Sequence, residues 1–165
     1  MAIQRIAVLG AGQMGNGITQ VAAAAGYDVI MIDIEQEYVD KGLATIQRSL
    51  TKLVSKERMS QEDADATLAR ISLATDRSVC ADCDLVVEAV PEILDLKTSI
   101  FAELDGICKP ETILASNTSS ISISTIADAT NRPDRVIGMH FMNPVPIMKL
   151  VEVINGDKTL SLIHI

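Results

Sequence analysis

A glycine-rich loop directly after a short aliphatic run is the feature that most constrains the fold of this chain. Residues 6–9 (Ile-Ala-Val-Leu) form the run, and residues 10–15 (Gly-Ala-Gly-Gln-Met-Gly) follow as a G-x-G-x-x-G loop. Apolar residues then recur at the spacing of one helix face over residues 14–25, and residues 27–32 indicate a second strand closed by Asp33. Strand, glycine loop, helix, strand and acidic residue in this order predict a dinucleotide-binding unit.

Each part of this unit has its own physical role. Gly10 permits a tight turn, Gly12 lets a pyrophosphate approach the backbone, and Gly15 lets the helix pack against the sheet. The N–H groups and the dipole at the helix start favour phosphate charge. Asp33 would accept hydrogen bonds from ribose hydroxyls and repel a 2′-phosphate, and residues 33–35 contain no Arg or Lys to receive one. We therefore predict NAD rather than NADP; a glycine turn in another α/β protein is the plainer alternative.

The bulk properties of the chain exclude several classes of protein. Its 165 residues suffice for one domain with a core, and 48% hydrophobic with only 2% aromatic residues suits a buried parallel sheet. The net charge of −8, without a basic stripe or an aromatic platform, argues against nucleic-acid binding. No apolar run reaches membrane-spanning length. The first strand begins almost at the N-terminus, leaving no room for a signal peptide, so we expect a cytoplasmic protein.

The cysteines allow two interpretations. Cys80 and Cys83 form a C-x-x-C, and Cys108 stands alone. A redox pair or half a zinc site is one interpretation, but no second C-x-x-C or nearby His completes a metal site. Reduced cysteines that pack in the core of a cytosolic protein are the better prediction, and we expect no metal.

Strands and helices alternate along the rest of the chain. A helical pair is predicted over residues 35–70, inserted after the second strand, with Ser60 as the N-cap of its second helix. Helices are also expected over 94–107 and 122–128, and further strands over 71–74, 84–90, 112–116, 136–141 and 150–154. This alternation predicts an α/β fold with a doubly wound, mostly parallel sheet of the Rossmann type.

His140 is the candidate base. It ends the strand 136–141, and a proline-rich turn separates it from the strand 150–154. If the two strands form a hairpin centred on Pro146, His140 lies opposite a semi-buried Glu152, with Cβ atoms about 4.5–5.5 Å apart. The carboxylate would fix the imidazole tautomer and orient it as a base. A structural histidine and a solvent-facing glutamate are the plainer alternatives.

Two further polar groups admit two readings each. Residues 117–120 (Asn-Thr-Ser-Ser) follow a parallel strand, where ligands bind. They are either donors to a ligand or a helix N-cap, supplied by Ser120 or Ser122. Ser49, Lys52 and Lys56 share one helical face, which is either a solvated surface or a phosphate-binding patch.

Together these residues resemble the NAD-binding domain of (S)-3-hydroxyacyl-CoA dehydrogenases, particularly the short-chain 3-hydroxybutyryl-CoA type. The resemblance runs from residue 3 to about 159, and the His-Phe-x-Asn-Pro stretch of 140–144 is specific to the wider superfamily. The matching stretches are 8–17, 85–91, 115–120, 138–146 and 148–154.

The resemblance implies a role for each matching residue. His140 would take the proton of the substrate 3-hydroxyl, Glu152 would orient it, and Ser119 would bind the substrate oxygen. Ser49 and Lys56 would meet the CoA moiety of an acyl-CoA substrate. The cofactor would contact Gly10, Gly12, Gln13, Met14, Gly15, Asp33, Ala89, Glu92, Lys97, Asn117 and Asn143.

The chain departs from this family after residue 159. Family members continue into an all-helical domain that supplies a catalytic asparagine, covers the cleft and forms a homodimer, and it is absent here. Residues 160–165 (Leu-Ser-Leu-Ile-His-Ile) can be back-translated into the end of a sequencing transposon adapter. We expect them to be non-native read-through and the domain, residues 1–159, to be incomplete and inactive alone.

Three rival interpretations remain open. The first is a related dehydrogenase of a free hydroxy acid such as gulonate. The second is a non-catalytic nucleotide-binding or structural protein, and the third is a part of a multifunctional β-oxidation protein. Fold alone does not choose among them.

Overall fold

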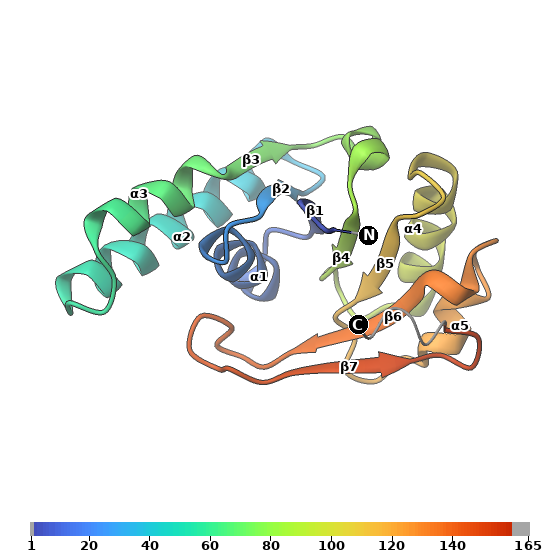
Figure 1. Cartoon of the computed structure of the whole chain (residues 1–165). Helices are drawn as coiled ribbons and strands as arrows, with labels where there is room; N and C mark the ends of the chain where they lie inside the picture. The colour runs from blue at the N-terminus through green and yellow to red at the C-terminus, as the bar shows by residue number, and fades with distance from the viewer. Residues whose placement is uncertain (1, 160–165) are drawn as a thin grey trace.

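Seven strands form one sheet in this computed structural model, which describes residues 2–159 (Figure 1). The strand order is β3-β2-β1-β4-β5-β6-β7. Every neighbouring pair is parallel except the β6–β7 hairpin, which is antiparallel. The strands are β1 (Arg5–Leu9), β2 (Asp28–Ile32), β3 (Ile71–Ala74), β4 (Leu85–Glu88), β5 (Ile113–Ser116), β6 (Val136–Phe141) and β7 (Val151–Asn155).

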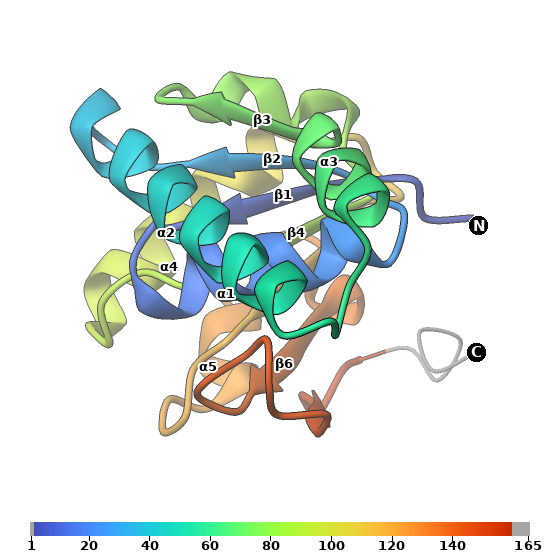
Figure 2. The ribbon, with the colours of Figure 1, turned by 90° about the vertical axis from the view of Figure 1, so that its left-hand side faces the viewer.

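Helices cover both faces of this sheet (Figures 1 and 2). Helix α1 (Gln13–Ala24) packs on one face, where α2 (Gln36–Ser55) and α3 (Gln61–Ala69) form the predicted pair between β2 and β3. Helices α4 (Leu94–Ile107) and α5 (Ile123–Ala127) pack on the opposite face. Short 3-10 helices η1 (Arg77–Asp82) and η2 (Pro133–Arg135) complete the fold. The predicted doubly wound, mostly parallel α/β fold is confirmed.

Alternate residues of the central strands supply the two cores. Ala7 and Leu9 of β1 face α4 and α5, whereas Ile6 and Val8 face α1. The central strands are buried on both faces, as parallel sheets between helices require. Strand β1 neighbours both β2 and β4, so the chain changes direction across the sheet at this point. The crevice outside the carboxyl ends of β1 and β4 is therefore where a doubly wound sheet places its ligand.

Several strand ends differ by one or two residues from the prediction, as at β4 and β7. Strand β4 ends at Glu88 rather than residue 90, because the Val90 N–H donates to the Glu88 carboxylate at 2.7 Å and not to a neighbouring strand. Strand β7 begins at Val151, since Leu150 still lies in the exposed turn. The predicted cap is confirmed at α3, where the Ser60 hydroxyl accepts the Asp63 N–H at 3.0 Å.

The three cysteines are buried in the core between the sheet and α4 as free thiols, which confirms their packing role. Burial raises the pKa of the Cys108 thiol to about 11, and burial raises the pKa values of the Cys80 and Cys83 thiols as well. Among residues 2–159, no group of three or more His, Cys, Asp or Glu side chains is arranged to hold a metal ion.

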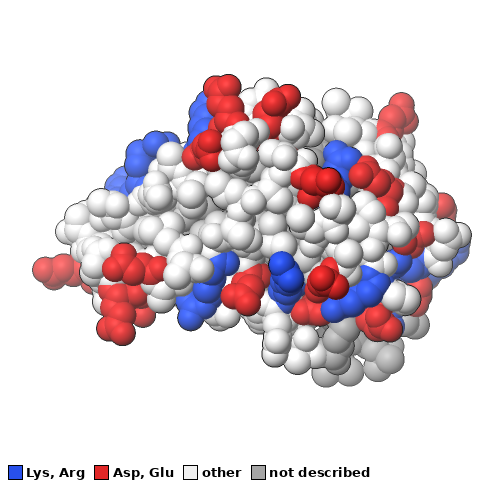
Figure 3. Space-filling view, turned by 90° about the horizontal axis from the view of Figure 1, so that it is seen from above, with Lys and Arg blue, Asp and Glu red and all other residues white. Residues whose placement is uncertain are grey.

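None of the described helices is both long and apolar enough to span a membrane. Figure 3 shows one face of the molecule, on which Lys and Arg side chains alternate with Asp and Glu rather than forming a basic stripe. The predictions for residues 160–165 lie outside the described part of the chain.

Candidate functional site

The glycine loop after β1 is shaped to receive a phosphate group. Gly10 has a φ of +99°, and a Cβ there would lie 2.6 Å from the Ala89 carbonyl oxygen. A Cβ on Gly15 would lie 1.7 Å from the Gly10 carbonyl oxygen, whereas one on Gly12 would meet nothing within 4 Å. Helix α1 begins without a side-chain cap and without an acidic residue in its first turn. The space in front of Gly12 and the free end of the helix therefore fit a pyrophosphate.

Asp33 follows β2 and braces this loop. Its Oδ2 accepts the Ala11 N–H at 2.7 Å, and its Oδ1 accepts the Ile34 N–H at 2.8 Å. The carboxylate lines a hollow of about 480 Å³ together with Arg77 and Glu103, which pair with each other. The sequence reasoning considered only residues 33–35 around the ribose and missed Arg77, which reaches this hollow because β3 runs parallel to β2.

His140 lies opposite Glu152 in the β6–β7 hairpin, so the predicted register is confirmed. The His140 Nδ1 lies 2.8 Å from the Glu152 Oε2, and its Nε2 lies 3.1 Å from the Ser119 Oγ. A carboxylate beside Nδ1 keeps a proton on that nitrogen and leaves the Nε2 lone pair available. The Glu152 side chain is 49% exposed, more open than the predicted semi-buried position, whereas that of His140 is 21% exposed.

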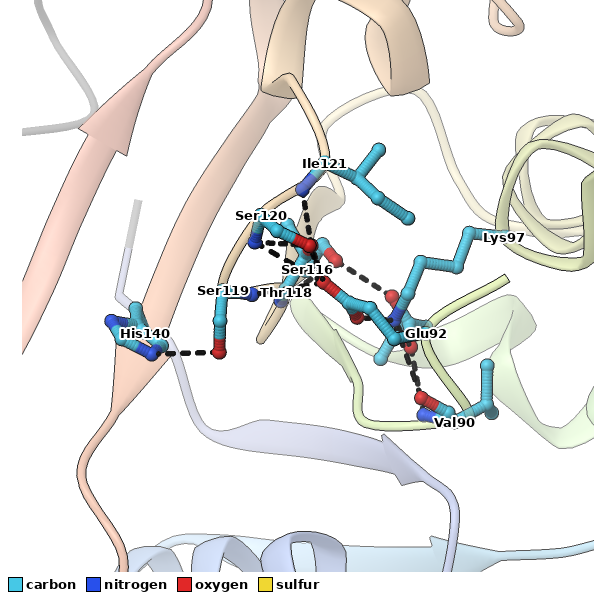
Figure 4. A network of polar contacts seen from close by, with 10 residues as sticks. Val90, Glu92, Lys97, Ser116, Thr118, Ser119, Ser120, Ile121 and His140 are labelled. Carbon is cyan, nitrogen blue, oxygen red and sulfur yellow. Dashed lines mark hydrogen bonds and ion pairs between the residues drawn. The ribbon is translucent and has the colours of Figure 1, made fainter. Parts of the chain in front are cut away.

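An ionic network with a buried inner pair and an exposed outer glutamate lies beside this histidine (Figure 4). The Glu88 and Lys97 side chains are 0% and 1% exposed, and the Lys97 Nζ lies 2.6 Å from the Glu88 Oε1. The same Nζ lies 3.2 Å from the Glu92 Oε2. Sequence reasoning assigned Lys97 and Glu92 to the cofactor but missed Glu88. A glutamate that ends an apolar strand, with a lysine in the first turn of the next helix, is the signal that could have found it.

Glu92 accepts several hydrogen bonds from the loop that follows β5. It accepts hydrogen bonds from the Thr118 hydroxyl, from the Ser119 N–H at 3.1 Å, and from the Ser120 N–H and hydroxyl at 3.2 and 3.1 Å. Burial alone would raise the pKa of Glu92, but the hydrogen bonds and the Lys97 ammonium outweigh it and hold that pKa at about 2. Of the two candidate caps, Ser122 and not Ser120 caps α5. The role of residues 117–120 as donors to a ligand stays a prediction.

The two predicted asparagines tie segments of the site together. The Asn117 Oδ1 accepts the Phe141 N–H at 2.9 Å, and the Asn143 Oδ1 accepts from the Gln13 Nε2 at 3.2 Å. The first bond joins the end of β5 to β6, and the second joins the start of α1 to the proline-rich turn. Met14 is partly buried in the core on the α1 side.

The predicted CoA residues lie on and after α2, away from this network. Ser49 is half-buried, and Lys56 is exposed as the residue that ends the helix. A shallow hollow of about 430 Å³ on the neighbouring face is lined by Arg48 and Lys52 but not by Ser49 or Lys56.

Fold, glycine loop and acidic residue together define a Rossmann-type dinucleotide-binding domain. A family model described as 3-hydroxyacyl-CoA dehydrogenase, NAD binding domain, matches residues 5–163. The chain belongs to this family, as the sequence resemblance predicted.

Relatives with known names point the same way. A probable 3-hydroxybutyryl-CoA dehydrogenase of Deinococcus radiodurans is 52% identical over 94% of this chain and 55% of its own length. A 3-hydroxybutyryl-CoA dehydrogenase of Bradyrhizobium diazoefficiens is 50% identical over 95% of this chain and 54% of its own. The crystal structure of (S)-3-hydroxybutyryl-CoA dehydrogenase from Ralstonia eutropha matches with a TM-score of 0.96 and 47% identity. The match covers 99% of this chain and 58% of the chain in that structure. The chain spans about half the length of these relatives.

Proposed function

We propose that this chain is the NAD-binding part of a dehydrogenase that oxidises (S)-3-hydroxyacyl-CoA to 3-oxoacyl-CoA, or catalyses the reverse reaction. The observation that carries the proposal is the line of Ser119, His140 and Glu152, joined by contacts of 3.1 and 2.8 Å. A base with an orienting carboxylate on one side and a hydroxyl on the other suits the removal of a proton from an alcohol.

Each of the three side chains has one task in this mechanism. The Nε2 of His140 takes the proton of the 3-hydroxyl, and Glu152 stabilises the imidazolium that results. The Ser119 hydroxyl, which already meets that nitrogen, donates a hydrogen bond to the substrate oxygen. A bound NAD would supply the acceptor for the hydride that leaves C3.

The residues around the glycine loop fit this cofactor. The open space before Gly12 would hold the pyrophosphate, and the free lone pairs of the Asp33 carboxylate would accept the adenosine ribose hydroxyls. We propose cofactor contacts for Gln13, Ala89, Glu92, Asn117 and Asn143, which all belong to the segments that surround this loop and the carboxyl ends of β4 to β6.

The substrate is proposed from the names of the relatives and from helix α2. Three of the named proteins above are 3-hydroxybutyryl-CoA dehydrogenases, so we propose a short acyl chain. Ser49 and Lys56 would hold the phosphate-bearing CoA handle. A free hydroxy acid such as gulonate, or a non-catalytic role, is not favoured because the relatives are acyl-CoA enzymes and the three site residues are in contact.

We also propose that residues 1–159 are completed by a helical domain that closes the cleft and forms a homodimer, and that residues 160–165 are non-native. Re-amplifying the locus from source DNA tests the second point, since recovery of the same six codons and a stop would contradict it.

The decisive assay follows NADH absorbance with acetoacetyl-CoA as substrate. We expect turnover by the complete gene product and none by the 165-residue chain alone. Turnover of gulonate instead of the acyl-CoA would establish the rival dehydrogenase, and turnover of neither would refute an enzymatic role.

A further inference from the structure

The Glu88–Lys97 pair has no role in the proton transfer proposed above, yet it is fully buried next to it. Placing two charges where their side chains are 0% and 1% exposed carries a large desolvation cost. Replacing such a pair with apolar side chains is often neutral or stabilising, so stability alone is a weak reason to keep it. Its place at the carboxyl end of β4, where a doubly wound sheet binds its ligand, suggests another reason.

Both oxygens of Glu88 and all three donors of Lys97 already have partners within the chain. The Glu88 Oε1 accepts from the Val90 N–H at 2.7 Å and the Lys97 Nζ at 2.6 Å, and its Oε2 accepts from the Ser116 hydroxyl at 2.6 Å. The Lys97 ammonium has three donors, and three acceptors surround it: Glu88, Glu92 and the Val90 carbonyl at 3.3 Å. Glu88 does not contact the reacting groups itself, so it acts through the residues that it holds, first Lys97 and then Glu92.

Glu92 transmits the position of Lys97 to the reacting groups. Its other oxygen holds the N–H groups of Ser119 and Ser120 and the Thr118 hydroxyl. The Ser119 hydroxyl in turn meets the Nε2 of His140 (Figure 4). A continuous series of contacts thus runs from the end of β4, through the first turn of α4, to the base in β6.

We propose that Glu88 is a positioning residue for this site. Its buried carboxylate fixes the Lys97 ammonium, Lys97 fixes Glu92, and Glu92 holds the Ser119 backbone at the distance that lets its hydroxyl meet both His140 and the substrate oxygen. Lys97 is then a positioning residue as well. The proposal deepens the proposed dehydrogenase function and rests on it.

The test replaces one atom of this carboxylate in the complete gene product. Glu88→Gln keeps the shape and an acceptor oxygen for the Val90 N–H, and its amide group donates to the Ser116 hydroxyl instead of accepting from it. The variant leaves the Lys97 charge matched by Glu92 alone, which draws Glu92 away from Ser119. We expect kcat for acetoacetyl-CoA reduction to fall about 10- to 100-fold, with a much smaller change in the KM of the acyl substrate, as displacement of a group that is aligned for reaction predicts.

A matched control separates positioning from stability. Asp105→Asn makes the same change in another largely buried ion pair, with Arg132, whose side chains are 9% and 13% exposed. Asp105 lies about two helical turns after Lys97 in α4, near the amino ends of the strands. Its side chain bonds to Asn131 and Arg132, which are not residues of the candidate site. We expect it to lower the melting temperature while kcat stays at the wild-type value. An equal loss of kcat in both variants would overturn the proposal.

A second variant keeps the test valid if Glu88→Gln folds poorly. Glu88→Gln with Lys97→Met removes the unmatched cation, and we expect a folded protein whose kcat is still reduced because no ammonium then holds the Oε2 of Glu92. Wild-type kcat in this double variant would overturn the proposal. Failure of the proposed function is distinguishable, because the wild-type complete gene product would then show no turnover of acetoacetyl-CoA at all.

Discussion

A carboxylate lies at each end of strand β4, and each is paired with a lysine, one within α4 and the other just after it. Asp84, just before the strand, accepts the N–H groups of Gln4 and Arg5 at 2.9 and 3.0 Å and pairs with Lys109 at 2.6 Å. Glu88, its last residue, pairs with Lys97 at the same distance of 2.6 Å. By distance alone the two pairs are alike.

Their surroundings separate them. The contacts of Asp84 end at the start of β1 and just after α4, and the Lys109 side chain is 37% exposed. The contacts of Glu88 continue through Lys97 and Glu92 to the loop before α5 and to His140. At the amino ends of the strands the ion pair thus joins neighbouring segments of the fold, whereas at the carboxyl ends it belongs to the candidate active site, as expected of a parallel sheet. The predictions below test this division.

The largest loss of activity is expected at His140, the last residue in the series of contacts that begins at Glu88. His140→Gln in the complete gene product removes the proposed base while keeping a polar side chain in β6. Loss of a general base predicts a fall in kcat of about 10²- to 10⁴-fold, measured with acetoacetyl-CoA and NADH at saturation. The control is Asp84→Asn at the amino edge, for which kcat should stay at the wild-type value. Wild-type activity in His140→Gln would remove the histidine from the mechanism.

Glu152→Gln probes the partner of this base. Glutamine retains an acceptor for the Nδ1 proton but not the negative charge, and a hydrogen bond to a charged group contributes about 1–1.5 kcal/mol more than a neutral one. Lost in the transition state, this difference corresponds to a fall of about 5- to 13-fold in kcat. Steady-state kinetics of the variant give the number directly. A change confined to KM would show that Glu152 contributes to substrate binding and not to the chemistry.

The two edges also differ in how much of them the sequence predicted. His140 opposite Glu152 followed from strand periodicity and one proline turn, because a hairpin fixes its own register. The Glu88–Lys97–Glu92 network did not, since it joins three segments whose contact depends on how α4 packs against β4. Arg77 was missed for the same reason, as it enters its hollow only through the pairing of β2 with β3. Local pairings are predictable from spacing, but contacts between packed layers need the fold.

At the amino ends of the strands, Asp84→Asn tests whether the Asp84 contacts stabilise the fold, through the pH dependence of the free energy of unfolding. Hydrogen bonds from Lys109 and from the Arg5 and Gln4 N–H groups hold the pKa of Asp84 at about 2. This pKa lies below the value of about 4 that Asp84 has in the unfolded chain, so between about pH 2 and pH 4 the unfolded chain binds more protons than the folded one. The stabilisation by Asp84 is therefore complete above about pH 4 and is lost as the pH falls towards about 2. Urea unfolding should show Asp84→Asn less stable by about 1–2 kcal/mol at pH 7 and nearly equal to wild type near pH 2. A difference independent of pH would contradict this origin.

The smallest effect is expected on helix α2, where the carboxyl-edge site would extend towards the CoA handle. Lys56→Glu reverses one exposed charge, and an exposed charge pair contributes about 0–1 kcal/mol, so the KM for acetoacetyl-CoA should rise a few-fold and the rise should shrink at high salt. Lys158→Glu is the matched control, because Lys158 is also exposed and pairs with Asp128 at the end of α5. An equal KM in the Lys56 variant and in wild type would favour a substrate without the CoA phosphates, and the division between the two edges of the sheet would then stand without any contribution from α2.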